Sequence, residues 1–341
     1  MTRSVSVIIV TWNALKHLQN YLPSVVDTDY ENFEIIIADN ASSDGSADWI
    51  RQHYPQCRIV TYPRNYGYCG GNNRAVEYAS GEILVFLNND VEVNPGWLSP
   101  LVKTFDDPKV AVAQPKIRSW NEQNHFEYAG AAGGYLDKYA YPFCRGRIFD
   151  TVEEDLGQYD NPADLFWASG AAFAIRKDRF LEAGRFDELF RFHMEEVDLC
   201  WRLLNSGYKI RFSPDSLVFH LGGGSLPMGS ARKTYFNFRN SLFMIWKNAD
   251  TEWLKRRLMI RFCLDGIAGF YALLKGNFSD FTSIIKAHFS FYFHWRTIHR
   301  KRLENRKFGI SPGRPEEMID ISVVRNYFID KKRTFGELVG R

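Results

Sequence analysis

The chain has 341 residues, of which 45% are hydrophobic and 24% are charged, and its formal net charge is +3. A chain of this length buries a full core as one large domain or two, and so small a net charge points to no particular class of partner. The five cysteines are scattered without a Cys-x-x-Cys pair, which argues against a zinc knuckle or a disulfide framework and fits a reducing compartment. The first residues lack the features of a signal peptide. No segment offers about 18 uninterrupted apolar residues, so no membrane-spanning helix is predicted.

The first ninety residues alternate between strand and helix patterns. Runs of branched apolar residues predict strands at 5–10, 33–38, 58–62 and 83–87. Amphipathic spacing predicts helices at 15–26 and 47–53. Residues 65–73, rich in Gly and Asn, are predicted as a loop before a helix that ends at Ala79. This alternation is typical of βαβ units around a parallel sheet.

The pattern changes after residue 94. Helices are predicted at 97–105, at 179–183 and from residue 193 to Gly207, with strands at 110–115, 167–175 and 217–220. Residues 121–165 have poor periodicity, and we expect a long irregular segment there.

Polar side chains follow three of the predicted strands. Thr11, Asp39 and Asp90 stand at the ends of the first, second and fourth strands, which meet at one edge of a parallel sheet. Ligands bind at this edge in open α/β sheets, so we predict a nucleotide site there. A carboxylate at Asp39 can accept the imide N–H of a pyrimidine, or it can simply cap the following loop. Asp90 is a hard oxygen ligand suited to Mg²⁺ or Mn²⁺, although Asn-Asn-Asp after a strand is also a common turn.

A second polar cluster lies at the start of a predicted helix. Glu195 and Glu196 occupy its first turn, where the helix dipole favours carboxylates, and where one of them can also serve as a general base facing the sheet edge. His220 precedes a glycine run and becomes a metal-ligand candidate only with a carboxylate partner such as Asp90. The glycines at 67, 70 and 71 match neither the dinucleotide-binding motif nor a P-loop. They either line a ligand or only allow a tight turn of the backbone.

Seven segments in this order resemble the family 2 inverting glycosyltransferases with a GT-A fold, and within them the rhamnosyltransferase-like branch. They are residues 7–13, 39–46, 65–73, 87–91, 170–172, 195–202 and 220–225. The Arg239-Asn240 pair is also similar to that branch. The resemblance covers residues 4–248. It implies an α/β catalytic domain at 1–248, built on a Rossmann-like mixed sheet flanked by helices, and a basic, aromatic helical extension at 249–341.

The resemblance also assigns residues to the donor site. It implies that Thr11, Asn13 and Asp39 hold the nucleotide, and that Asn65 and Gly71 line the donor pocket.

Asn88-Asn89-Asp90 stands where the family has Asp-x-Asp. The resemblance therefore implies that Asn88 and Asn89 lie beside the donor, while Asp90 and His220 bind Mg²⁺ or Mn²⁺. Glu196 stands where the family usually has the aspartate that acts as catalytic base, with Glu195 as the alternative. Asn88 replaces an Asp, which removes one charge near the ribose and the diphosphate.

The implied reaction is a metal-dependent, inverting transfer of one sugar from a nucleotide-diphosphate sugar, with dTDP-rhamnose slightly favoured. The implied acceptor is a hydroxyl of a cell-surface glycan or a lipid-linked oligosaccharide. One alternative is a UDP-hexose donor. A sugar nucleotidyltransferase is less favoured, because residues 11–15 are not the Gly-rich basic loop that such an enzyme needs. A non-catalytic glycan-binding protein is disfavoured by the joint presence of Asp90, Glu196 and His220.

Residues 286–307 carry seven Lys and Arg against one acid, interleaved with aromatic residues. This composition suits the surface of an anionic membrane, and a packed helical appendage or a homodimer interface is the alternative. Nothing upstream supports nucleic-acid binding, which we do not expect. The predicted location is the cytoplasm, with peripheral contact at the inner face of the cell membrane.

Overall fold

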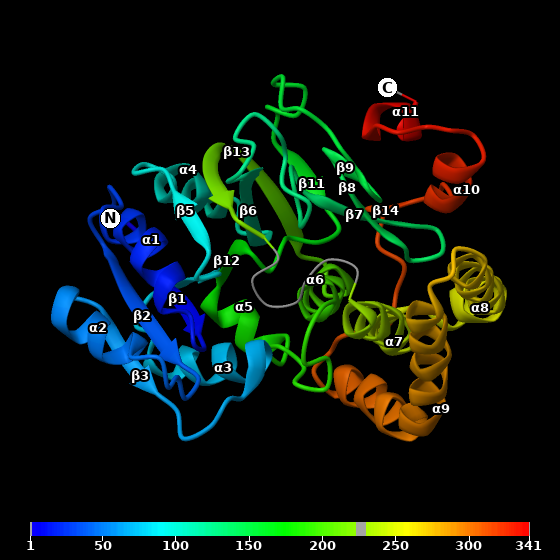
Figure 1. Cartoon of the computed structure of the whole chain (residues 1–341), viewed down its shortest axis with the longest axis horizontal. Helices are drawn as coiled ribbons and strands as arrows, with labels where there is room; N and C mark the ends of the chain where they lie inside the picture. Colours follow the sequence, from blue (N-terminus) through cyan, green and yellow to red (C-terminus); the bar gives the residue numbers. More distant parts are fainter. Residues whose placement is uncertain (1, 223–229, 341) are drawn as a thin grey trace.

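The computed structural model describes residues 2–222 and 230–340 of the chain. A nine-stranded mixed sheet runs through its centre in the order β11-β13-β6-β12-β4-β1-β2-β3, with β5 beside β13 (Figure 1). Residues 223–225, part of the glycine run after His220, lie outside the described residues.

One half of the sheet is parallel, as the sequence predicts. Neighbouring strands β4, β1, β2 and β3 all run in the same direction. They span Val5–Thr11 (β1), Phe33–Asp39 (β2), Arg58–Thr61 (β3) and Ile83–Leu87 (β4). The near-continuous apolar runs arise because both faces of a parallel sheet are covered.

Two hydrophobic cores form on the opposite faces of this sheet. Along β1, Val7 and Ile9 point into one core, and Ile8 points into the other. The first core is covered by α1 (Leu15–Val26), α2 (Ser46–His53) and α4 (Leu98–Lys103). The second is covered by α3 (Gly67–Ala75), α5 (Lys177–Glu182) and α6 (Glu195–Asn205).

The expected loop at residues 65–73 is wrong, because α3 begins at Gly67 inside the glycine-rich run. A Cβ at Gly71 would lie 2.9 Å from Val10 Cγ1 and from Asn40 Nδ2. Glycine therefore lets this helix approach β1 closely, and that packing overrides the weak helix propensity of the segment. A short 3₁₀ turn, Val76–Tyr78, follows the helix.

The other half of the sheet is mixed. Strand β12 (Ala172–Arg176) runs antiparallel between β4 and β6 (Val110–Ser119). Beyond β6 lie β13 (Lys209–His220), β11 (Ala163–Leu165) and β5 (Val91–Val93). The strand predicted at 167–175 is wrong over its first five residues. There the Trp167 carbonyl accepts from Gly134 and the Ser169 N–H donates to the Gln114 side chain, instead of pairing in a ladder.

Residues 121–165, predicted to be irregular, contain most of a second, five-stranded sheet. Its strands are β7 (Gly134–Asp137), β8 (Pro142–Cys144), β9 (Arg147–Ile148), β10 (Thr151–Val152) and β14 (Met318–Ile319). Each has two to four residues, too few to show the alternation that predicts a strand.

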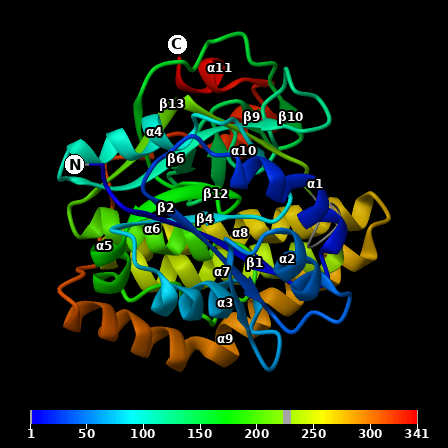
Figure 2. The same ribbon diagram turned by 90° about the vertical axis from the view of Figure 1, so that its left-hand side faces the viewer.

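The last part of the chain is mainly helical and lies on the side of the molecule away from β1–β3 (Figures 1 and 2). Its helices are α7 (Ala231–Asn248), α8 (Thr251–Leu274), α9 (Phe278–Lys307), α10 (Val323–Phe328) and α11 (Phe335–Val339). The long helix α9 packs along α7. Among the described helices, none is both long enough and apolar enough to cross a bilayer.

Candidate functional site

The ends of β1 and β2 form the first part of the site. Thr11 and Asp39 are direct neighbours in the parallel register, and both are buried. The Asn40 N–H donates to the Thr11 carbonyl at 2.8 Å, and Asp39 Oδ1 accepts from the Ser42 N–H at 3.2 Å. The structure therefore brings these two side chains together, and Asp39 also caps the loop that follows it.

Asn13 braces the loops after β1 and β2 against one another. It adopts a left-handed backbone with φ 50°, and its side-chain oxygen accepts from the Ser43 N–H at 2.7 Å. Its own N–H donates to the Ser42 hydroxyl at 2.9 Å. Asn13 thus fixes the rim of the site beside Asp39.

Asn88, Asn89 and Asp90 follow β4 at the same edge. The Asn89 amide donates to the Thr11 hydroxyl at 3.3 Å, which links this turn to the first pair of strands. Asp90 Oδ1 lies 3.2 Å from His220 Nε2, and the Asn88 amide lies 3.5 Å from the same nitrogen. The predicted pairing of Asp90 with His220 is therefore present in the fold.

A third group, Glu127, lies beside His220 and was not predicted. Its Oε1 is 3.4 Å from His220 Nδ1, so the imidazole stands between two buried carboxylates. Burial disfavours the charged ring, but the charges of Glu127 and Asp90 outweigh it and raise the pKa of His220 to about 10. Burial likewise opposes ionisation of Asp90, yet the hydrogen bond and the charge of His220 lower its pKa. No sequence motif marks Glu127, which lies in the segment expected to be irregular.

Asp90 and His220 bring one carboxylate and one imidazole to a single point. Within the described residues, no group of three or more His, Cys, Asp or Glu side chains is arranged to hold a metal ion. Mg²⁺ typically takes one or two protein ligands and completes its shell with substrate phosphates and water. These two candidate ligands therefore fit a divalent cation bound together with a diphosphate, and not a closed structural metal site.

Glu195 and Glu196 occupy the first turn of α6, as predicted. A Cβ on Gly170 would lie 3.8 Å from the Glu196 carboxyl carbon, so this side chain faces the segment before β12. Burial raises the pKa of Glu196 to about 7, and burial together with the charge of Glu196 raises the pKa of Glu195. Among the described residues, the Oε2 atom of each has no hydrogen-bond partner.

Residues 169–171 connect the two carboxylate clusters. The Asn88 N–H donates to the Ala171 carbonyl at 2.9 Å, and the Tyr68 hydroxyl donates to the Gly170 carbonyl at 2.8 Å. Asn88 thus bonds to this segment beside Asp90, while Glu196 faces the same segment from α6. The turn that carries Asp90 and the helix start that carries Glu196 therefore contact the same short segment.

The Arg239-Asn240 pair holds the backbone that leads into α6. Three non-glycine residues there, at 191, 193 and 194, have positive φ, a conformation that costs energy unless the surroundings enforce it. The Arg239 guanidinium donates at 3.0 Å to the carbonyls of residues 189 and 190. The Asn240 amide donates at 2.7–2.9 Å to those of residues 190, 192 and 193. This motif therefore sets the position of Glu195 and Glu196.

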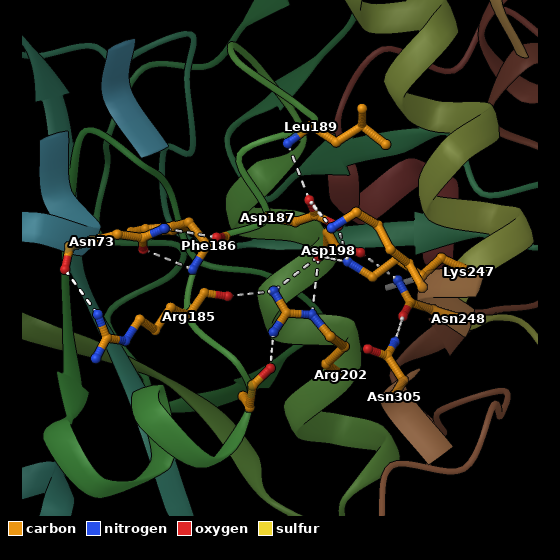
Figure 3. A network of polar contacts seen from close by, with 12 residues as sticks. Asn73, Arg185, Phe186, Asp187, Leu189, Asp198, Arg202, Lys247, Asn248 and Asn305 are labelled. Carbon is orange, nitrogen blue, oxygen red and sulfur yellow. Dashed lines mark hydrogen bonds and ion pairs between the residues drawn. The ribbon is translucent and has the colours of Figure 1, made fainter. Parts of the chain in front are cut away.

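A buried polar network fixes the body of α6 (Figure 3). Asp198 accepts from Lys247 at 2.8 Å and from Arg202 at 2.9 Å. Lys247 also pairs with Asp187 at 2.8 Å, and Asp187 pairs with Lys301 of α9 at the same distance. The network joins α6 to α7, to α9 and to the turn before α6.

Asn65 and Gly71 have structural contacts in the described fold. The Asn65 side chain accepts from the Gly67 N–H at 2.7 Å at the start of α3. Gly71 packs against β1, and its carbonyl accepts from the Tyr62 hydroxyl at 3.0 Å. Their contacts position α3, and their predicted contact with a donor stays a prediction.

The geometry agrees with what the chain is similar to. Residues 6–153 match the family described as Glycosyl transferase family 2, and residues 83–234 match Glycosyl transferase family group 2. Residues 6–234 are therefore similar to family 2 glycosyltransferase domains. The two matches together take in Thr11, Asp39, Asp90, Glu196 and His220.

Two curated relatives come from Mycobacterium tuberculosis. A pre-mycofactocin glycosyltransferase is 27% identical over 240 residues, which cover 69% of this chain and 46% of the relative. An N-acetylglucosaminyl-diphospho-decaprenol L-rhamnosyltransferase is 25% identical over 292 residues, covering 76% of this chain and 94% of the relative. This chain thus spans about half the length of the first relative and nearly all of the second.

Two solved structures share the GT-A fold that the sequence resemblance implies. GalNAc-T7 with UDP, GalNAc and Mn²⁺ has a TM-score of 0.58 and 19% identity, covering 73% of this chain and 49% of its own. The mannosyltransferase PcManGT from Pyrobaculum calidifontis, in complex with GDP-Man and Mn²⁺, has a TM-score of 0.53 and 16% identity. The match covers 97% of this chain and 89% of that chain. The prediction of an α/β, GT-A-like mixed sheet flanked by helices, with a helical C-terminal region, is confirmed.

Proposed function

We propose that this protein transfers a single sugar from a nucleotide-diphosphate sugar to an acceptor hydroxyl, with a divalent metal and with inversion at the anomeric carbon. One observation carries the proposal. Asp90 pairs with His220 after β4, while the nearby Asn88 N–H and the Glu196 carboxyl both approach the short segment at residues 170 and 171. We assign this chemistry to residues 1–248, with 249–341 as the extension.

The donor would lie along the ends of β1, β2 and β4. Asp39 and Thr11 would hold the base and ribose, beside a rim that Asn13 fixes. Asn88 and Asn89 would lie next to the sugar nucleotide, and Asp90 and His220 would hold Mg²⁺ or Mn²⁺. When bound, the metal would neutralise charge that develops on the diphosphate as it leaves. His220 would have to lose its proton before its Nε2 ligates a metal.

Glu196 would be the general base. Its pKa of about 7 lets it exist as a carboxylate near neutral pH and still accept a proton from the acceptor hydroxyl. The hydroxyl oxygen bonds to the anomeric carbon while the bond from that carbon to the diphosphate oxygen breaks. A single displacement from the opposite face inverts the anomeric configuration. Glu195 is the more buried of the two carboxylates, which makes it the second choice.

The donor we favour is dTDP-rhamnose, because the relative that this chain covers over 94% of its length is named an L-rhamnosyltransferase. That relative's name also specifies a sugar on a diphospho-lipid, so we propose a lipid-linked or cell-surface glycan acceptor, reached from the cytoplasmic side. A UDP-hexose is the alternative donor, since one structural neighbour holds UDP and GalNAc.

The test is to incubate the purified protein with Mg²⁺ or Mn²⁺ and a panel of nucleotide sugars, with and without acceptor extracts. We expect release of a nucleoside diphosphate that depends on both metal and acceptor. Glu196→Gln should keep donor binding and lose roughly 10²-fold or more in turnover. Unchanged turnover would place the base elsewhere. Release of pyrophosphate from a nucleoside triphosphate and a sugar phosphate would instead indicate a nucleotidyltransferase.

A further inference from the structure

Helix α8 exposes a stripe of large apolar side chains and buries a charged pair. Its buried side holds Arg261 and Asp265, joined at 2.9 Å, whereas large apolar side chains face outward. The outward side chains, each between 43% and 70% exposed, are Met259, Ile260, Ile267, Phe270, Tyr271 and Leu274. Their successive spacings of one, three or seven residues place them on one side of the helix. Such a stripe needs an apolar environment outside the protein.

Helix α9 extends this apolar surface. Ile285, Phe289 and Tyr292 are 40–61% exposed, and together with Gly266 of α8 they line a groove of about 220 Å³ where the two helices meet. A larger groove of about 670 Å³ lies between α7 and α9 and shares Phe289. We call the outward stripe of α8 and these α9 residues the apolar face. The helices that carry it lie on the side of the molecule away from β1–β3 (Figures 1 and 2).

The positive charge of residues 251–307 distinguishes between two partners that could cover the apolar face, a second copy of the chain and a lipid bilayer. Residues 251–307 hold twelve Lys and Arg against four Asp and Glu. Lys275, Lys286, Arg296 and Arg300 are all exposed. A second copy docking through the same face would bring these cations against each other, because a two-fold interface pairs a surface with itself. An anionic bilayer attracts the cations and also accepts the apolar side chains.

We propose that the apolar face docks on the surface of an anionic lipid bilayer, with α8 and α9 lying in the interface without crossing it. The groove between α7 and α9 shares Phe289 with this face and lies beside the segment that leads into α6. It is lined by Arg232, whose guanidinium lies 5.6 Å from the ring of Phe192, just before α6. The docked protein would therefore hold Glu196 close to a lipid-linked acceptor. That purpose rests on the proposed function, whereas the docking itself does not.

The experiment uses the full chain and vesicles of phosphatidylcholine, with or without phosphatidylglycerol, in a sedimentation assay. We expect binding to the anionic vesicles that weakens as salt is added. Replacing two stripe residues, Ile267→Glu with Phe270→Glu, should lower vesicle affinity at least about ten-fold, since each places a charge among lipid tails. The control is Leu156→Glu, at a 78% exposed side chain in a loop outside the C-terminal helices, which should bind like the wild type.

Failure of the docking proposal is distinguishable from failure of the proposed transfer. Nucleoside diphosphate release with a water-soluble acceptor should be equal in the double variant and the wild type, because neither residue touches the site. Absence of wild-type binding to anionic vesicles, or equal binding by the double variant, would overturn the docking proposal. A wild-type dimer that light scattering shows to become a monomer in the double variant, without vesicle binding, would overturn it in favour of self-association.

Discussion

Lys247 bridges two buried carboxylates, and replacing it with methionine keeps most of its volume while deleting the charge between them. Its ammonium lies 2.8 Å from Asp187 and 2.8 Å from Asp198, and the Lys247 residue is 3% exposed (Figure 3). Removing one partner of a buried ion pair costs about 3–5 kcal/mol, because the remaining charge stays buried without compensation. Asp198 keeps Arg202 and Asp187 keeps Lys301, so we expect a loss near the lower end, about 3 kcal/mol.

The matched control is Lys301→Met, which removes the other cation from Asp187. The Lys301 side chain is 30% exposed, and water screens its pair, so the expected loss is about 1 kcal/mol or less. A second check adds Asp187→Asn to the Lys247 variant. Removing one uncompensated carboxylate should restore part of the stability, because the two sites share a partner and are not additive.

The measurement is urea unfolding followed by tryptophan fluorescence, with the free energy of unfolding extrapolated to water. The pH dependence gives an independent readout. Burial opposes ionisation of Asp187, but Lys247 and Lys301 lower its pKa. The stability that ionised Asp187 contributes to the fold is therefore fully present above the pKa of an aspartate in the unfolded chain, about 3.9. That stability is lost as the pH falls below this value. The Lys247 variant should show a smaller acid-induced loss. A Lys247→Met loss no larger than that of Lys301→Met would refute this account of the network.

Three further predictions concern the site and its support. Because the pKa of Glu196 is about 7 and a base must be deprotonated, kcat/KM should rise as pH increases through 7 and then level off; a flat profile from about pH 5.5 to 8.5 would contradict the base assignment. Glu127→Gln should weaken Mn²⁺ binding about 10–100-fold in a calorimetric titration with donor present, whereas equal affinity would mean that Glu127 does not orient His220. Gly71→Val should destabilise the protein by about 1–3 kcal/mol, because its Cβ would lie 2.9 Å from Val10 Cγ1. Gly96→Ala, with nothing within 4 Å and an ordinary φ, is its control, and equal thermal shifts would contradict the packing argument.

The parallel half of the fold was predictable because its signal is local. Strands buried on both faces need continuous apolar runs, and the polar residues that end them must meet at one edge of the sheet. Thr11, Asp39 and Asp90 therefore lie where the sequence predicts. The glycine-rich helix α3 was missed for the opposite reason, since propensity argues for a loop and only contact with β1 explains the helix.

The support around the site was not predictable from local patterns. Glu127 reaches His220 because β6 and β13 pair side by side, which brings together residues 93 positions apart. Lys247 and Lys301 have no motif, and their importance depends on how α7 and α9 pack against α6. Such contacts come from tertiary arrangement, whereas the motifs indicate only which residues stand at the ends of the elements.

The five-stranded sheet cannot be completed until the end of the chain has been synthesised. Its edge strand β14 pairs with β7, so Met318 lies beside Leu136, and buried Asp137 accepts from the N–H of Val323 at 3.0 Å. These partners are more than 180 residues apart in the sequence. During synthesis β7 must therefore wait, with one side unpaired, until the ribosome has made α7, α8 and α9. The central parallel strands are complete long before that, so the chain should form the sheet edge with Thr11, Asp39 and Asp90 early and close its second sheet among the last steps.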